Sequence, residues 1–120
     1  MSKPAAQILL ERYWDEVNNQ GKLELIRELC ADPIIRHDPG KVTALSHDEQ
    51  IARVRFGIEE MGIVITRVIT HASDTMVTSV WNMTATRKND LAMCGIEVFK
   101  LEHGRLAHCW NTPYAEGHWS

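Results

Sequence analysis

Two polar side chains interrupt strongly apolar runs in the last third of the sequence. Glu97 lies in "GIEVF", among isoleucine, valine and phenylalanine, which is an unusual position for a carboxylate. Asn111 lies in "HCWNTPY", where a carboxylic acid would suggest catalysis and an apolar residue would suggest core. An asparagine can orient a substrate or bind an oxyanion, but it cannot exchange a proton. The plain alternatives are a Glu97 that points to solvent and an Asn111 that satisfies backbone groups at a strand end.

A second pair of candidates lies in "RHDPG", near the end of the first third of the chain. His37 is of the residue type best suited to proton transfer near neutral pH. Asp38 precedes Pro39 and is also a common turn residue, because its side chain can bond the backbone two positions on. The two alternate along the chain, so only one of them is expected to face a cavity.

Composition excludes several classes of protein. At 120 residues we expect one domain, and 13 basic against 16 acidic residues leave no electrostatic signature of nucleic-acid or membrane-surface binding. No apolar run is long enough to span a bilayer, and acidic residues follow the first apolar patch too soon for a signal peptide. Three widely spaced cysteines, Cys30, Cys94 and Cys109, indicate reduced thiols and a cytoplasmic protein.

Motifs for cofactors are not found in the sequence. The six histidines and three cysteines contain no pair at a metal-ligand spacing such as C-x-x-C or H-x-x-x-H, so we expect no metal site. No glycine-rich phosphate loop occurs, so a nucleotide cofactor is not expected either. Any activity is therefore predicted to be cofactor-free.

The order of predicted elements is helices first and strands second. Apolar residues recur at helical spacing over residues 4–19, and a shorter helical face, Leu23 to Cys30, ends near Asp32. Ser46 and Glu49 form a capping box that opens a third helix. From residue 63 onward, β-branched and aromatic runs over 63–72, 75–87, 91–102 and 105–114 predict an antiparallel meander. The chain is thus predicted to be α+β, with helices on one face of a curved sheet.

Period-2 alternation predicts which side chains share a strand face and could line a pocket between sheet and helices. Glu97 shares a face with Gly95 and Phe99, and Asn111 shares one with Cys109 and Pro113. Ordinary core packing is the alternative for these apolar side chains. The candidate pocket residues are Trp81, Met83, Phe99 and Cys109.

Two long segments resemble a known superfamily. "RYWDEVNNQGKLELIRELCADPIIRHDP" and "GIEVFKLEHGRLAHCW" are similar to signatures of the nuclear-transport-factor-2-like superfamily, closest to its SnoaL-like polyketide cyclases and ketosteroid isomerases. The resemblance covers nearly the whole chain and implies one SnoaL-like domain over residues 1–120. It implies a cone-shaped α+β fold in which three N-terminal helices and a curved, mainly antiparallel sheet enclose an apolar pocket. Members usually pair into a homodimer through the sheet.

The resemblance also implies roles for individual residues. Tyr13 matches the isomerases' tyrosine, Asp38 their general-base aspartate, and Glu97, one methylene longer, their protonated carboxylic acid. In that chemistry a carboxylate removes a proton beside a carbonyl while neutral donors hold the developing oxyanion; the ketosteroid isomerase is a standard worked case of it. His37 remains the rival to Asp38 as base, and core packing is the alternative for Tyr13.

Asn111 departs from the cyclase pattern. Cyclases commonly carry an acid–base aspartate after the strand's tryptophan, whereas this chain has Trp110-Asn111. If the chain is an enzyme, its base must therefore lie elsewhere, at His37 or Asp38, with Tyr13, Glu97 and Asn111 orienting the substrate's oxygen.

Two functions follow from the sequence. The first is a small-molecule enzyme that performs isomerisation, cyclisation or dehydration by acid–base chemistry on an apolar, cyclic carbonyl compound. The second is a non-catalytic small-molecule-binding or assembly protein that uses the same pocket. In either case we expect a homodimer formed by the outer sheet face, because β-branched and other apolar residues such as Ile96 and Val98 occur on that face too.

Overall fold

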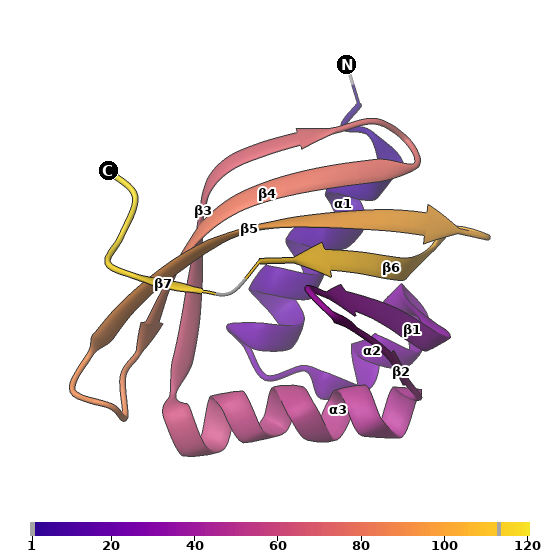
Figure 1. Cartoon of the computed structure of the whole chain (residues 1–120). Helices are drawn as coiled ribbons and strands as arrows, with labels where there is room; N and C mark the ends of the chain where they lie inside the picture. Colours follow the sequence, from indigo (N-terminus) through magenta and orange to yellow (C-terminus); the bar gives the residue numbers. More distant parts are fainter. Residues whose placement is uncertain (1, 113) are drawn as a thin grey trace.

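The computed structural model describes residues 2–112 and 114–120 (Figure 1). The chain folds as three helical regions packed on one side of a mainly antiparallel sheet, as the α+β prediction requires. The predicted position of Pro113 beside Cys109 and Asn111 lies outside the described residues. No helix within the described ranges is long and apolar enough to cross a membrane.

The first helical region confirms the prediction for residues 4–19. α1 (Ala5–Arg12) continues directly into η1 (Tyr13–Asn18), a π-helical segment that brings Tyr13, Trp14 and Asn18 to the buried side. π-helical turns are rare and frequently occur at functional sites because they shift the positions of side chains on one face. Gly21 then adopts a positive φ of 73°, which ends the region.

The second helical region is shorter than predicted. η2 (Leu23–Leu25) and α2 (Ile26–Leu29) end before Cys30, which the helical spacing had assigned to the helix face. Cys30 has extended backbone angles and starts β1 (Cys30–Asp38), where it pairs with Leu106. Pairing with a distant strand, which sequence spacing cannot reveal, therefore decides the conformation of this residue.

β1 turns at Gly40 into β2 (Lys41–Leu45), a strand that the sequence analysis did not predict. The third helix, α3 (His47–Phe56), begins as predicted with a reciprocal capping box between Ser46 and Glu49. It continues into η3 (Gly57–Met61) and ends at Gly62, which has a positive φ of 67°.

The predicted meander is confirmed. β3 (Ile63–Ala72), β4 (Met76–Ala85), β5 (Leu91–Glu102) and β6 (Arg105–Asn111) pair in sequence order and antiparallel. The sheet order is β2-β1-β6-β5-β4-β3, in which β1 joins β6 in parallel, and β7 (Ala115–Glu116) adds to the far end of β5. The parallel pair brings residues 35–37 beside residues 108–110.

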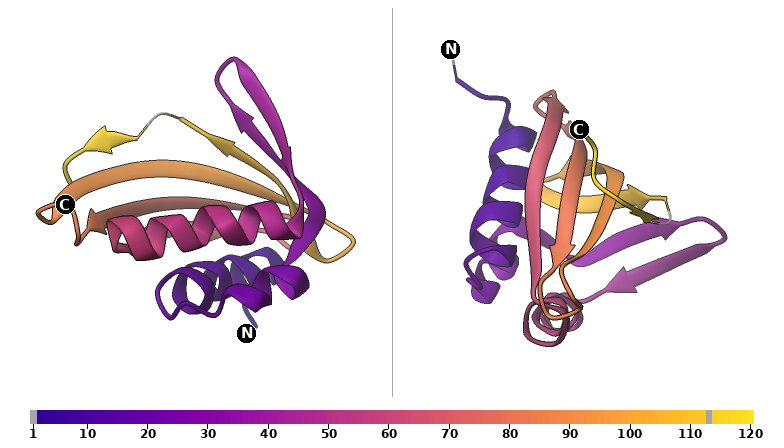
Figure 2. Two further views of the ribbon diagram at one scale, coloured as in Figure 1. Left: turned by 90° about the horizontal axis from the view of Figure 1, so that it is seen from below. Right: turned by 90° about the vertical axis from the view of Figure 1, so that its left-hand side faces the viewer.

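The sheet is curved, and the helices lie along its concave side (Figure 2). The alternation along β5 is as predicted: Gly95, Glu97 and Phe99 are buried, whereas Ile96 and Lys100 are exposed. Aromatic side chains of η1 and the sheet pack in the core, where Trp14 contacts Phe99 edge-on with ring centroids 5.8 Å apart. This packing leaves part of the space between sheet and helices unfilled.

Candidate functional site

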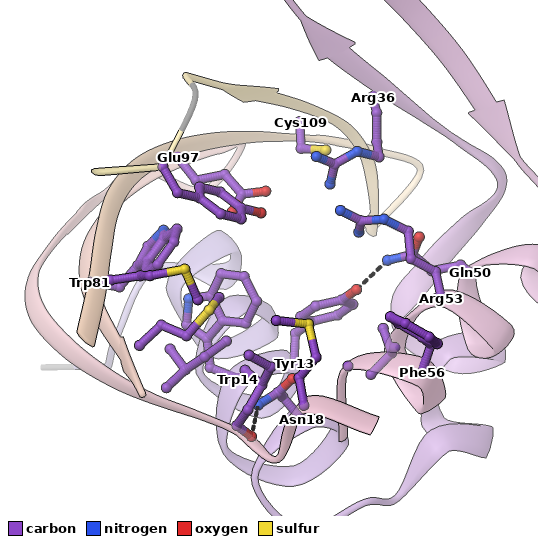
Figure 3. A pocket seen from close by; sticks show the side chains of 18 of the residues that line it. Tyr13, Trp14, Asn18, Arg36, Gln50, Arg53, Phe56, Trp81, Glu97 and Cys109 are labelled. Carbon is purple, nitrogen blue, oxygen red and sulfur yellow. Dashed lines mark hydrogen bonds between the residues drawn. The ribbon is translucent and has the colours of Figure 1, made fainter. Parts of the chain in front are cut away.

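A cavity of about 290 Å³ lies between the concave sheet face and the helices (Figure 3). Its walls come from η1, α3, η3 and the inner faces of β1 and β3–β6. The four predicted pocket residues, Trp81, Met83, Phe99 and Cys109, all line it, together with aromatic, aliphatic and methionine side chains of the helices and of β3. The cavity is therefore mostly apolar, as ligand sites usually are.

Trp81 occupies the cavity wall because its cross-strand partner is a glycine. Gly95 faces Trp81 across β4 and β5, and a Cβ at this position would come within 2.5 Å of the indole ring. The indole therefore lies where a side chain on Gly95 would otherwise stand, and a glycine within a strand commonly marks such a close approach. The indole N–H of Trp81 has no hydrogen-bond acceptor in the described part of the chain.

Glu97 is the buried carboxylate of this cavity. It is only 4% exposed, and its carboxyl group points inward from β5 (Figure 3). Burial raises the pKa of Glu97 to about 7, against an ordinary value of 4.5. The positive charges of Arg36 and Arg53 oppose this rise, because they favour the ionised form. The alternative that the sequence left open, in which Glu97 points to solvent, is therefore excluded.

Asn111 is the cross-strand partner of Glu97. Its neighbours set the orientation of the amide: the nitrogen donates to Glu97 Oε2 at 2.7 Å and Oε1 at 3.0 Å. The amide oxygen accepts from Arg36 Nη2 at 3.1 Å. Asn111 thus links the buried carboxyl group to a guanidinium group, and its polar atoms bond side chains rather than a strand end.

The sequence analysis missed two arginines of the site. Arg36 comes from β1 and Arg53 from α3, and both line the cavity. Arg36 could have been found, because it lies two residues before Asp38 and so shares its strand face. Arg53 follows Gln50 by three residues on one helix face, but only the tertiary structure shows that this face meets the cavity.

Tyr13 and Gln50 form the polar contact on the helix side. Both are buried, and Gln50 Nε2 donates to the Tyr13 hydroxyl oxygen (Figure 3). Burial raises the pKa of Tyr13 far above its usual value, so the phenol stays protonated at any working pH. Because its oxygen accepts from Gln50, the Tyr13 proton is free to be donated to another acceptor. Gln50 Oε1 has no donor within the described ranges.

Asp38 lies at the mouth of the site and not inside it. Its carboxylate accepts from Arg36 Nη2 at 3.2 Å. Together with Arg53 and Asn111, Asp38 lines a shallow hollow that adjoins the main cavity. The structure therefore brings Asp38 close to the polar end of the site.

His37 does not reach the cavity. As the neighbour of Asp38 in a strand, it points to the opposite face, where its ring stacks on Trp110 with centroids 4.6 Å apart. Its Nε2 is 3.0 Å from His108 Nδ1. The sheet separates the imidazole from the cavity, so of the two candidate bases Asp38 is the one on the cavity side.

Among residues 2–112 and 114–120, no group of three histidine, cysteine or acidic side chains is arranged to hold a metal ion. The polar groups that line the cavity include the carboxyl group of Glu97, the phenols of Tyr13 and Tyr114, the amides of Asn18 and Gln50, the unpaired indole N–H of Trp81 and the guanidinium groups of Arg36 and Arg53. Such a set can accept a proton, donate hydrogen bonds to an oxygen and bind a negative charge.

Solved structures with this fold include proteins named as isomerases and cyclases. One is a protein from Kribbella flavida named as a ketosteroid isomerase, with a TM-score of 0.77 and 14% identity over 97% of this chain and 82% of that one. Another is a protein from Acidithiobacillus ferrooxidans named as a polyketide cyclase, with a TM-score of 0.77 and 24% identity over 92% and 89% of the two chains.

A third solved structure contains a ligand. It is a Mycobacterium tuberculosis protein in complex with estradiol-17β-hemisuccinate, with a TM-score of 0.75 and 13% identity over 91% of this chain and 93% of that one. No protein-family model and no curated protein sequence matches the chain. The fold that the resemblance implied is thus confirmed, because the chain shares it with solved structures named as ketosteroid isomerase and polyketide cyclase.

Proposed function

We propose that this protein is a SnoaL-like, cofactor-free enzyme that moves a proton on an apolar, cyclic carbonyl compound, in an isomerisation, cyclisation or dehydration. One observation carries the proposal: a carboxyl group with its pKa raised to about 7 lies at the polar end of an apolar cavity. A general acid–base group is most effective when its pKa lies near the working pH. Perturbed carboxyl groups in cavities are typical of catalytic sites.

In this proposal Glu97 is the base that removes a proton from the carbon beside the carbonyl and returns it elsewhere. Asn111 orients Glu97 by donating to both of its oxygens. Tyr13, whose hydroxyl already accepts from Gln50, donates to the substrate oxygen as it becomes anionic. This arrangement gives Glu97 the base role that the sequence analysis left between His37 and Asp38, and Asp38 positions Arg36.

Two unpaired polar atoms support a ligand with polar substituents. Trp81 Nε1 and Gln50 Oε1 are buried without partners among the described residues, and both side chains line the cavity. A buried donor or acceptor without a partner costs about 1–3 kcal/mol, which a ligand's carbonyl or hydroxyl group would offset. The steroid derivative bound by the M. tuberculosis protein of the same fold supports a flat, ring-bearing ligand.

The experiment is exchange of α-protons for deuterium in a simple cyclic ketone, 1-tetralone, followed by NMR. The proposal expects exchange that increases with protein concentration and is lost in Glu97→Gln. Asp38→Asn retains most of the exchange, because Asp38 acts through Arg36 and not on the substrate carbon. If 1-tetralone binds and its α-protons exchange no faster than in buffer, the proton-transfer proposal is wrong.

The alternative is a binding protein without turnover, and one observation favours it. Asn111 hydrogen-bonds both Glu97 and Arg36, so these groups already have partners within the protein. In that case the Asn111 amide helps to hydrogen-bond the polar edge of a ligand. The exchange experiment separates the two functions, because a binding protein takes up the ketone without exchanging its protons.

We also propose that residues 1–120 form one SnoaL-like domain and that two copies pair through the outer sheet face. The support for pairing is a set of exposed apolar side chains on outer positions of the sheet, which include Ile96 at 43% and Trp110 at 38% exposure. Exposed apolar patches on a protein surface commonly mark contact sites. The three free, buried cysteines are consistent with the predicted cytoplasmic location.

A further inference from the structure

We propose that the molecule bound in this cavity is an apolar organic acid, whose carboxylate is held between Arg36 and Arg53 while its ring system fills the apolar part. This inference rests on the proposed function because it names the substrate class of the same site. It concerns binding of the acid group, which the proton-transfer chemistry does not itself require.

The first argument is the position of the two guanidinium groups. Arg36 reaches in from β1 and Arg53 from α3, and both side chains extend into the same end of the cavity, opposite the carboxyl group of Glu97 (Figure 3). Two guanidinium groups from different elements can bind the two oxygens of one carboxylate. Arginine is well suited to this task, because its fixed donors match the planar geometry of a carboxylate.

The second argument is the local balance of charge. Arg36, whose side chain is only 12% exposed, has one carboxylate partner, Asp38 at 3.2 Å. Within residues 2–112 and 114–120, no carboxylate oxygen lies within 4.0 Å of Arg53, and Glu97 forms no ion pair with either arginine. The raised pKa of Glu97 leaves part of its population neutral near pH 7. Arg53 is exposed and lines both the cavity and the adjoining hollow, so this end carries two guanidinium charges against one paired carboxylate and a partly neutral Glu97, and it is net positive.

The third argument is the contrast between the charged end of the cavity and its apolar walls. Away from the arginines, the walls are formed by Trp14, Trp81, Met83, Met93 and Phe99, which bind rings and methylene groups and not charge. A ligand that matches both ends has an apolar ring body and one acid group. A neutral ligand would leave Arg53 with water and no charged partner, and a small inorganic anion would not contact the apolar walls.

The test compares a ring-bearing acid with its neutral isostere. Binding of 2-naphthoic acid and 2-naphthamide is measured by calorimetry and by the fluorescence of the cavity tryptophans. Hydrogen bonds to charged groups contribute about 1.5–3 kcal/mol, so the wild type should bind the acid about 10- to 160-fold more tightly than the amide. Arg53→Gln should remove most of this preference and leave amide binding within about twofold.

The control is Arg55→Gln, which removes the same charge from the same helix. Arg55 is exposed, as Arg53 is, but it lies 3.9 Å from Glu59 and does not line the main cavity, so the preference for the acid should persist. Equal affinity of the wild type for acid and amide would overturn the inference. An acid preference that is equal in Arg53→Gln and in the wild type would overturn the assignment to Arg53.

The two proposals can fail separately. Tight, arginine-dependent binding of 2-naphthoic acid without α-proton exchange on any ketone would support the acid site and overturn the enzyme. Exchange on 1-tetralone with no preference for the acid would support the enzyme and overturn the acid site. The wild-type comparison needs no variant, so it decides the question even if Arg53→Gln folds poorly.

Discussion

The two faces of the sheet carry different proton-transfer groups, a buried carboxyl group on the inner face and a histidine pair on the outer face. On the inner face, Glu97 and Asn111 are buried against the cavity. On the outer face, His37 bonds His108, whose other ring nitrogen lies 3.2 Å from Glu102 Oε1 at the protein surface. The histidines are of the residue type usually chosen for chemistry at neutral pH, yet the cavity contains the glutamate.

Burial explains the difference. An exposed carboxyl group ionises well below neutral pH, whereas removal from water raises the pKa of Glu97 to about 7. The inner face therefore converts an ordinary acid into a group that can accept and release protons at neutral pH. Residue type alone is a poor guide to which face does the chemistry.

The largest expected effect separates Glu97 from His37. Glu97→Gln should lower α-proton exchange by about 10²- to 10⁴-fold, the usual contribution of a positioned acid–base group. The exchange rate of the wild type should rise with pH and level off above about pH 7, because the ionised carboxylate is the base. The measurement is the pH profile of deuterium incorporation by NMR.

His37→Gln is the matched control on the outer face. It should change the exchange rate less than about threefold, since no atom of the imidazole faces the cavity. A loss as large as that of Glu97→Gln would mean that the outer face takes part in the chemistry, and the comparison of the two faces would then be wrong.

The second prediction compares two tryptophans, one on each face. Trp81→Ala should lower the free energy of unfolding by about 3–5 kcal/mol, because a fully buried indole is lost from the cavity wall. Trp110→Ala should lower it by less than about 1 kcal/mol, because this side chain is 38% exposed. Urea denaturation at one low protein concentration measures both, and similar losses would contradict the assigned burial.

The third prediction is a dependence of stability on pH. As pH rises from about 4.5 to 7, the unfolded chain loses the Glu97 proton while the folded protein keeps it, so stability falls and then levels above the folded pKa. The raised pKa corresponds to roughly 3 kcal/mol across this window. Glu97→Gln should remove the part of this decline in the free energy of unfolding that comes from Glu97.

The free energy of unfolding of the wild type and Glu97→Gln is measured at a series of pH values. The comparison variant is Glu60→Gln, which changes an exposed carboxylate on η3. If the difference between Glu97→Gln and the wild type is the same at pH 5 and pH 8, the buried carboxyl group does not titrate as described.

The smallest expected effect concerns the outer face as a contact surface. Ile96→Asp should shift the protein from dimer to monomer in sedimentation at micromolar concentration, because it puts a charge on the exposed side of β5. Ile8→Asp, at an exposed position on α1, should leave the dimer intact. A wild-type protein that is already monomeric under these conditions would contradict the proposed pairing.

The sequence by itself determined most of the architecture. Helical spacing predicted the helix that contains Tyr13, the capping box located the start of α3, and period-2 alternation placed Glu97 with Phe99 on one strand face. These features depend on neighbours a few residues apart, whose preferences the sequence states directly. The four predicted cavity residues also follow from alternation and line the cavity.

Only the tertiary structure decided which polar groups meet. The parallel pairing of β1 with β6 places Arg36 beside Asn111 and turns His37 away, and α3 brings Arg53 to the same point. The pKa of Glu97 likewise depends on burial by residues far away in the chain. Long-range pairing and desolvation arise from the folded arrangement as a whole, so no local pattern in the sequence could state them.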